Sequence, residues 1–445
     1  MIVGRIIGAL LGLLPVAAVA AEPPPARLSG SIRARYEHID GQARPGFSSV
    51  EDLFVTRTAI QAEAGNGPLR LVFELFDSRA FGIGPRSVVG TGDVNTLELV
   101  QAHVAADLGA VLGHGSHASL RAGRMILNLG SRRIVAADEY RNTTNGYTGL
   151  RLDLGHEVGV EASFIYVLPQ QRLPDDAASL RSGRVVLDRE SFDATLWGGI
   201  AAWKQALGDS TLEASYFRFD ERDSPRLQTR DRHLDTLGIR IFKVPKPSLF
   251  DHELEVIHQS GSNSASVGTS VPQLDASAWF VHADLGYTFA SAWKPRLSIE
   301  YDHASGDGAG PGNTRFDTLF GMRRADLAPS GIYAALGRTN ILTPGIRLEF
   351  VPSERADGFV AARALWAASA TDGFSTTQVR DASGQSGRFA GYQLEGRLRR
   401  WLIPRRLRAE INSVLLLRRG LLQTAPNAPP GDRTFYLSVA LTTSF

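Results

Sequence analysis

The sequence predicts an all-β fold, a transmembrane antiparallel up-and-down β-barrel of about 18 strands. Short segments with an apolar residue at every second position recur along most of the 445 residues. This is the period of a strand with one face in lipid and one in water. The connections between these segments alternate between short and long. The last segment, residues 434–445, keeps the alternation up to the final residue, Phe445. Together the three observations favour a closed barrel over a soluble sheet.

Both ends of the chain indicate where such a barrel would reside. A carboxy-terminal strand that ends in an aromatic resembles the assembly signal of bacterial outer-membrane barrels. At the other end, Arg5 precedes an apolar run over residues 6–19 and a small-residue A-x-A pattern, which is the layout of a secretory signal peptide. The run is shorter than the roughly 20 apolar residues of a spanning helix. We expect residues 1–21 to be a signal peptide and residues 22–445 to form a single outer-membrane β-barrel with long extracellular loops.

The composition excludes several classes of function. Cysteine is absent, which excludes disulfide bonds and thiolate chemistry. The 48 Lys and Arg nearly balance the 46 Asp and Glu, so the chain is no bulk binder of nucleic acid. Arg dominates the basic residues, and its planar fork suits carboxylates and phosphates. Lys occurs at four positions, all in or beside connections that we assign to the periplasmic rim: Lys204, Lys243, Lys246 and Lys294.

The period-two segments follow one another in a regular order. They begin near Leu28, Asp52, Pro68, Asn95, Ala118, Tyr147, Glu157, Phe192, Thr211, Leu234, Asp251, Asp275, Lys294, Gly345, Asp357, Arg388, Arg406 and Thr434. Short connections follow even-numbered segments, at residues 65–67, 154–156, 244–247, 291–293, 352–355 and 403–404. Long connections follow odd-numbered ones, including residues 78–94, 127–146, 168–191, 304–344 and 370–387. Short periplasmic turns and long outer loops are typical of outer-membrane barrels.

The membrane decides which face of each strand is charged. In residues 297–302, Leu297 and Ile299 alternate with Glu300 and Asp302. Because the outward face must meet hydrocarbon, the charged face belongs inside, where about 18 strands leave an aqueous lumen. The inward charges expected on this basis are Arg33, Arg35, Glu37, Arg57, Arg70, Glu74, Glu98, Arg151, Glu161, Arg240, Glu255, Glu300, Arg347, Glu349, Arg397, Arg399, Arg408 and Glu410. They either favour anionic solutes or simply pair with one another and solvate the lumen.

Two long connections combine apolar residues with clustered charge. Residues 123–144 are too apolar to extend freely into water, and they carry Arg132, Arg133, Asp138 and Arg141. A loop that folds back into the lumen and narrows it reconciles both facts. The second such connection covers residues 316–340. Its charged residues include Asp317, Arg323, Arg324 and Arg338. Acids such as Asp138 and Asp317 either hold the Arg side chains in place or weaken their field.

At these segments the sequence resembles the alginate-export family of outer-membrane porins. The matching stretches are GRMILNLGSRRIVAADEYRNT, DTLFGMRRADLAPSGIYAALGRTNI, PGIRLEFVPSERADGF, WAASATDGF, VRDASGQSGRFAGYQLEGRLRRWLIP and APNAPPGDRTFYLSVALTTSF. The resemblance implies an 18-stranded barrel whose Arg-lined, electropositive constriction passes an anionic uronate polymer. It implies lumen or constriction roles for Arg124, Arg132, Arg133, Arg141, Arg323, Arg324, Arg338 and Arg397.

The predicted function is therefore an outer-membrane channel for an anionic polysaccharide or oligosaccharide. Its expected partners are that anionic solute, outer-membrane lipid and periplasmic export proteins. A general or small-acid-selective porin is the alternative. An outer-membrane hydrolase is disfavoured because no Ser, His and acid arrangement is recognisable. We expect no cofactor and no metal, since His114 and His117 alone offer two ligands in a Gly-rich turn.

Overall fold

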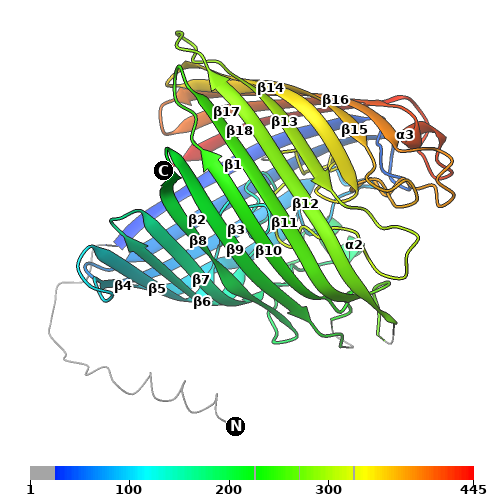
Figure 1. Ribbon diagram of the computed structural model, residues 1–445. Helices are drawn as coiled ribbons and strands as arrows, with labels where there is room; N and C mark the ends of the chain where they lie inside the picture. Colours follow the sequence, from blue (N-terminus) through cyan, green and yellow to red (C-terminus); the bar gives the residue numbers. More distant parts are fainter. Residues whose placement is uncertain (1–25, 225–226, 270, 324–325) are drawn as a thin grey trace.

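A computed structural model describes residues 26–224, 227–269, 271–323 and 326–445. The predicted signal peptide, residues 1–21, and Arg324 lie outside the described residues. Within the described ranges, 18 strands form one antiparallel sheet in which each strand pairs with the next. The first strand also pairs with the last, from Ser31 opposite Ser444 to Asp40 opposite Phe435. The sheet is therefore a closed barrel, as predicted (Figure 1).

The first nine strands are β1 (Ala26–Asp40), β2 (Val50–Ala64), β3 (Leu69–Phe81), β4 (Asn95–Gly109), β5 (Ser116–Met125), β6 (Tyr147–His156), β7 (Val160–Pro169), β8 (Ala194–Leu207) and β9 (Ser210–Glu221). The others are β10 (His233–Lys243), β11 (Phe250–Ser264), β12 (Gln273–Thr288), β13 (Arg296–Ala304), β14 (Ile341–Ser353), β15 (Ala356–Trp366), β16 (Phe389–Ile403), β17 (Leu407–Arg418) and β18 (Arg433–Ser444). Two short helices, α2 (Ala177–Ser182) and α3 (Leu421–Thr424), lie in loops.

Each predicted strand start lies within four residues of an observed one. The largest difference is at β14, which begins at Ile341 rather than Gly345. Pro344 has no amide N–H and indicated a strand boundary in the sequence, but in the structure it lies within the strand, opposite Tyr301. One short turn is also displaced. β6 continues to His156, so its turn occupies residues 157–159 rather than 154–156.

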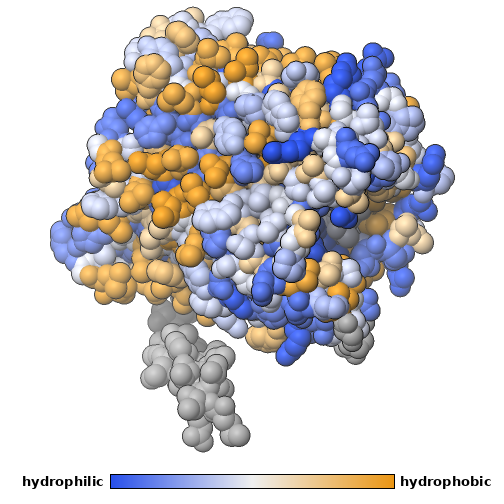
Figure 2. Space-filling view, turned by 45° about the vertical axis from the view of Figure 1, so that its right-hand side comes forward, coloured by the Kyte–Doolittle hydropathy of each residue, from blue (hydrophilic) through white to orange (hydrophobic). Residues whose placement is uncertain are grey.

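The outer wall of the barrel is apolar and its inner wall is charged. On β13, Leu297 and Ile299 are 49% and 64% exposed, whereas Glu300 and Asp302 are buried inside. Figure 2 shows apolar side chains gathered on the outer wall. This arrangement is the reverse of a soluble barrel and fits a wall surrounded by hydrocarbon. Within the described ranges, no helix is both long and apolar enough to cross a membrane.

Two long connections fold into the barrel, as their apolar character predicted. We call residues 126–146 the first inner loop and residues 305–340 the second inner loop. They meet where Val135 forms a parallel bridge with Phe320. The first inner loop reaches the wall at Tyr140, whose hydroxyl lies 2.7 Å from that of Tyr436 on β18. The second reaches it at Tyr333, whose hydroxyl donates to Gln393 on β16. The buried apolar core therefore lies partly within the lumen.

Candidate functional site

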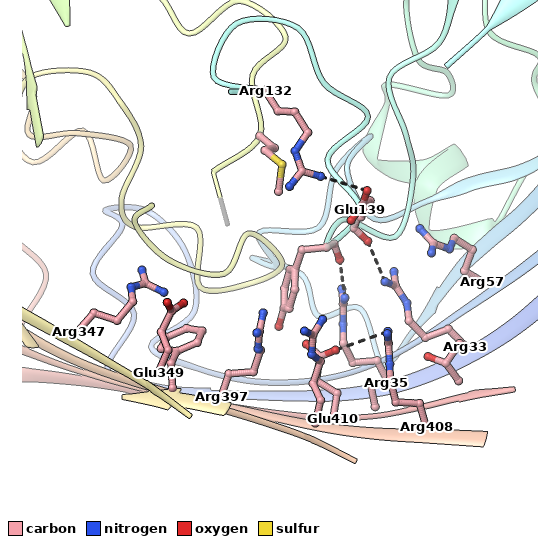
Figure 3. A pocket seen from close by; sticks show the side chains of 16 residues that line it. Arg33, Arg35, Arg57, Arg132, Glu139, Arg347, Glu349, Arg397, Arg408 and Glu410 are labelled. Atoms are coloured by element: carbon pink, nitrogen blue, oxygen red, sulfur yellow. Dashed lines mark hydrogen bonds and ion pairs between the residues drawn. The ribbon is translucent and has the colours of Figure 1, made fainter. Parts of the chain in front are cut away.

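A cavity of about 540 Å³ lies on the short-turn side of the inner loops. Its lining residues are Arg33, Arg35, Arg57, Arg132, Glu139, Tyr140, Met322, Arg347, Glu349, Phe359, Arg397, Arg399, Arg408, Glu410, Ala440 and Thr442. We call this cavity the basic vestibule, because among these described residues eight arginines face three glutamates. Figure 3 shows their side chains directed into the cavity from neighbouring strands and from the inner loops.

Strand register brings the basic residues together. Arg33 on β1 lies directly opposite Arg57 on β2. On its other side Arg33 lies opposite Thr442 on β18, which in turn lies opposite Arg408 on β17. Since neighbouring strands are about 4.8 Å apart, Arg408, Arg33 and Arg57 form a row across four adjacent strands. Arg35 follows two positions along β1 and faces the same side.

Arg33 and Arg57 are held by hydrogen bonds to the first inner loop and not by ion pairs. Arg33 donates to the carbonyls of Glu139 at 3.1 Å and Arg141 at 2.6 Å, and Arg57 donates weakly to the latter at 3.4 Å. No carboxylate of the described residues forms an ion pair with either guanidinium, and neither Nε has a hydrogen-bond partner there. Like charges directly opposite one another on a sheet are destabilising. Glu410 acts on Arg33, and Glu74 and Glu139 act on Arg57, without forming ion pairs, so the pair presents incompletely balanced positive charge to the vestibule.

The other vestibule arginines are held by acids. Arg35 lies 2.6 Å from Glu37 and stacks on the ring of Tyr140. The remaining pairs are Arg132 with Glu139 at 3.3 Å, Arg347 with Glu300 at 2.5 Å, Arg397 and Arg399 with Asp357 at 3.1 and 2.8 Å, and Arg408 with Glu410 at 3.8 Å. These ion pairs hold the guanidinium groups in fixed positions around the cavity.

The neighbouring wall of the lumen has a different charge balance. A cavity of about 340 Å³ near β10–β14 contains Arg240 and Arg296 together with several acids. Arg240 pairs with Glu253 at 3.0 Å, and Arg296 binds both Asp251 and Asp284. Every one of these positive charges is therefore balanced. The lumen is polarised, with surplus positive charge on the side of β1, β2 and β15–β18.

Two of the residues that the sequence singled out, Arg132 and Arg397, line the basic vestibule. Arg133 and Arg338 lie elsewhere, in what we call the Asp326 cluster. Asp326, in the second inner loop, binds Arg133 at 2.8 Å and Arg338 at 3.0 Å. Arg133 also binds Glu253 and Glu255 on β11. This cluster ties the first inner loop to the second and both to the barrel wall.

Electrostatics strengthens the Asp326 cluster. Burial alone would raise the pKa of Asp326, but Arg133 and Arg338 outweigh burial and hold that pKa well below its usual value. Burial would likewise lower the pKa of Arg133, but Asp326, Glu255 and Glu253 raise it well above its usual value. Both shifts favour the charged forms of the two groups.

The other predicted site residues lie apart from the vestibule. Asp138 is fully buried and lies 3.0 Å from Arg141. Burial, with a further contribution from Arg141, lowers the pKa of Arg323 to about 10. Asp317 pairs at 2.8 Å with Arg232. From the sequence, Asp138 and Asp317 could either hold Arg side chains in place or weaken their field. In the structure both acids hold Arg side chains in place.

Arg124 lies in the barrel wall near its long-loop end. β5 stops at Met125, and the Arg124 side chain binds Glu98 on β4 and Glu190 in the loop of residues 170–193, each at 2.7 Å. Asp188 continues this contact, since it accepts from the Asn95 side chain at 2.9 Å and donates its backbone N–H to Glu98 at 2.7 Å. The cluster therefore fastens the loop to β4.

This attachment should depend on pH. Burial, with a further contribution from Glu98, raises the pKa of Asp188 to about 7. An Asp in an unfolded chain releases its proton near pH 4. Because Asp188 is protonated up to a higher pH in the folded loop than in the unfolded chain, the attachment of this loop to β4 weakens as the pH rises from about 4 to about 7. We expect proteolysis of residues 170–193 to be roughly tenfold slower at about pH 5 than at about pH 8, with a protease active at both. Asp188→Asn should remove the difference, and equal rates in the unmodified protein would contradict this.

Sequence reasoning placed Arg33, Arg35, Arg57, Arg399 and Arg408 on inward faces but did not single them out as site residues. The missing information was register across strands. Arg33 and Arg57 are seven positions from the ends of β1 and β2, so a symmetric hairpin around residues 41–49 places them opposite one another. That spacing was the available signal. Alternation within a strand gives only the face of a residue, not its cross-strand neighbour.

The fold resembles solved structures of outer-membrane proteins. OccAB1 of Acinetobacter baumannii superposes with a TM-score of 0.60 and 14% identity, over 94% of this chain and 96% of that one. OccK2 (OpdF) of Pseudomonas aeruginosa, in complex with glucuronate, gives 0.57 and 12% over 96% and 99%. OpdK of the same organism, with vanillate, gives 0.58 and 10% over 94% and 98%. At such identities the likeness concerns the fold. No curated protein matches the sequence.

The family comparison covers nearly the whole barrel. A family model described as alginate export matches residues 25–421, a range that reaches from the start of β1 into α3. It contains both inner loops and most of the basic vestibule. Together with the closed 18-stranded barrel and its apolar outer wall, this match shows that the chain belongs to the alginate export family and is a channel of the bacterial outer membrane.

Proposed function

We propose that the channel selects carboxylated solutes of the uronate type, and that the basic vestibule is its selectivity element. The observation that carries the proposal is the pair of Arg33 and Arg57, which lie opposite one another and form no ion pair with a carboxylate of the described residues. An anionic solute would relieve the repulsion between them. Two unit charges about 4 Å apart attract by roughly 1 kcal/mol in water and about 4 kcal/mol near a protein surface.

Conduction also requires that the solute can leave. In the row, Arg33 and Arg57 lie on neighbouring strands, and Arg408 lies two strands from Arg33, beyond Thr442. A carboxylate can therefore pass from one guanidinium to the next without being trapped at a single strong site. The complex of OccK2 with glucuronate supports a sugar acid as the solute. The family and the fold point to a channel rather than an enzyme.

Passage of a uronate polymer is the second candidate. The row of arginines favours it, because successive carboxylates of one chain could occupy successive positions, and so does the description of the family. A single sugar acid and a polymer make the same use of the vestibule. The polymer needs a wider path past the inner loops than the single sugar acid does. The Asp326 cluster holds these loops in position.

Planar-bilayer recording of the full-length barrel tests the proposal. Under a potassium chloride gradient we expect an anion-selective reversal potential, because surplus Arg lines the vestibule. Glucuronate should carry current and reduce the chloride current in competition. Swelling of proteoliposomes in galacturonate monomers and in oligomers of increasing length separates the two candidates. A cation-selective channel, or one that glucuronate neither crosses nor blocks, would refute the proposal.

A further inference from the structure

A second cavity, of about 390 Å³, lies at the long-loop end of β7–β9. We call it the outer pocket. It is bounded by β9, by the loop of residues 170–193 and by the tip of the second inner loop at Phe320. Long loops lie on the extracellular side of bacterial barrels, so this pocket faces the medium and the basic vestibule faces the periplasm. Its volume is within the roughly 300–1,000 Å³ of small-molecule sites.

One side of the outer pocket is a fixed aromatic surface. Phe219 and Phe320 pack edge to face, with ring centroids 5.3 Å apart and an interplanar angle of 89°. Tyr147 packs edge-on against Phe320 at 5.6 Å. Two backbone hydrogen bonds hold Phe320 against the first inner loop. The Phe320 N–H donates to the carbonyl of Ile134, and the Phe320 carbonyl accepts from the N–H of Ala136. Phe320 is only partly buried, so its held ring remains available to a ligand in the pocket.

The other side of the pocket is polar, and its acids exceed its bases. Arg189 and Arg232 face Glu190, Asp193 and Glu221 among the described lining residues. Arg232 is fully occupied, because it binds Glu221 at 2.6 Å and Asp317 at 2.8 Å. Glu190 is likewise paired with Arg124 at 2.7 Å and Asp193 with Arg222 at 2.6 Å, so all three acids of the lining are already balanced by arginines. Each carboxylate oxygen can still accept a further hydrogen bond, so the same lining suits the hydroxyl groups of a neutral ligand.

We propose that the outer pocket is a binding site for a neutral saccharide. A pyranose ring would lay its C–H face on Phe320 and donate its hydroxyl groups to Glu190, Asp193 and Glu221. Aromatic rings present a negative face to such slightly positive C–H groups. The site is separate from the basic vestibule, and its acids are paired with arginines, so it suits a ligand that carries no charge of its own. Sugar recognition at the extracellular mouth and carboxylate recognition at the periplasmic side are thus divided between two places.

The test uses the full-length barrel in planar bilayers, with maltose added to one side at a time. We expect maltose to reduce the chloride current from the long-loop side. Phe320→Leu keeps an apolar anchor of similar size and loses the ring, so the maltose concentration for half-block should rise about fivefold. Phe320→Trp should retain the block. The double variant Arg33→Gln with Arg57→Gln should lose anion selectivity and keep the maltose block, which separates this proposal from the proposed function.

Three results would overturn the saccharide site. The first is that maltose added on the long-loop side does not reduce the chloride current. The second is that maltose blocks the Phe320→Leu channel as strongly as it blocks the unmodified channel. In the third, phenol but not maltose blocks from that side, and the ligand of the pocket is then an aromatic ring. Heat-modifiable migration on gels confirms that each variant forms the closed barrel, and the Phe320→Trp variant provides a second reading if Phe320→Leu fails to assemble.

Discussion

Replacing Arg33 and Arg57 by Gln should lower the anion-to-cation permeability ratio about tenfold. The two guanidinium groups are adjacent, face the vestibule and have no acid partner among the described residues. Neutralising them therefore removes positive field that the more distant Glu74, Glu139 and Glu410 offset only in part. Reversal potentials under a salt gradient give the ratio directly. Barrel stability should rise slightly or stay unchanged, because the repulsion between the two charges is removed as well.

Two controls separate charge from geometry in this experiment. The double variant Arg33→Lys with Arg57→Lys keeps both charges and loses the forked donors, so it should keep most of the selectivity. Arg151→Gln removes a lumen arginine that is already paired with Asp153 at 2.8 Å, and its effect should be small. If Arg151→Gln changes selectivity as much as the double Gln variant, the lumen responds to its total charge and not to the unpaired pair.

Replacing Asp326 by Asn should release the inner loops. Asp326 binds Arg133 and Arg338, and both guanidinium groups are almost completely buried. Arg133 keeps Glu253 and Glu255, but the buried Arg338 loses the carboxylate that binds it, which costs about 3–5 kcal/mol. We expect a larger and noisier single-channel conductance, together with faster proteolysis within residues 305–340. The barrel itself should remain closed, because its strands do not depend on this cluster.

A matched control for this variant is Asp209→Asn. Asp209 is an exposed acid in a short turn and lies 3.7 Å from Lys243, so its removal should leave conductance and proteolysis unchanged. The low pKa of Asp326 adds a further condition. The Asp326 carboxylate stabilises the inner loops fully at pH values above the ordinary pKa of Asp, near 4. This stabilisation is lost only as the pH falls through the much lower pKa of Asp326 in the folded protein. Acidification to about pH 5 should therefore not reproduce the effect of the substitution.

The sequence predicted the barrel because lipid imposes a rule on every strand. Leu297 and Ile299 must face outward wherever the strand lies in the sheet, so period-two alternation alone reveals the element. The inner loops were predictable for a related reason, since the apolar residues of 126–146 and 305–340 must be buried away from water. β14 was harder to delimit, because Pro344 has no amide N–H to donate to a neighbouring strand; in the structure it lies opposite Tyr301 on β13 and has no partner in the register with β15.

The site was only partly predictable, because it depends on contacts between distant segments. Arg133 and Arg338 are 205 positions apart and meet at Asp326 only after both inner loops have folded inward. No local pattern distinguishes such a buried, paired Arg from one that lines a cavity. Arg132, the neighbour of Arg133, does line the vestibule. Irregular loop backbone has no fixed period, so the direction of each side chain there follows from tertiary structure alone.

The seam between β1 and β18 lies inside the basic vestibule. Arg33 belongs to the first strand of the barrel and Arg408 to the last but one, and Thr442 on β18 lies between them. Arg33 and Arg57 already meet in the β1–β2 hairpin, but Arg408 joins them only when the two edges of the sheet meet and the seam hydrogen bonds form. A molecule that inserts without closing would therefore lack the Arg408 end of the row, so the strength of its anion preference also reports whether assembly is complete.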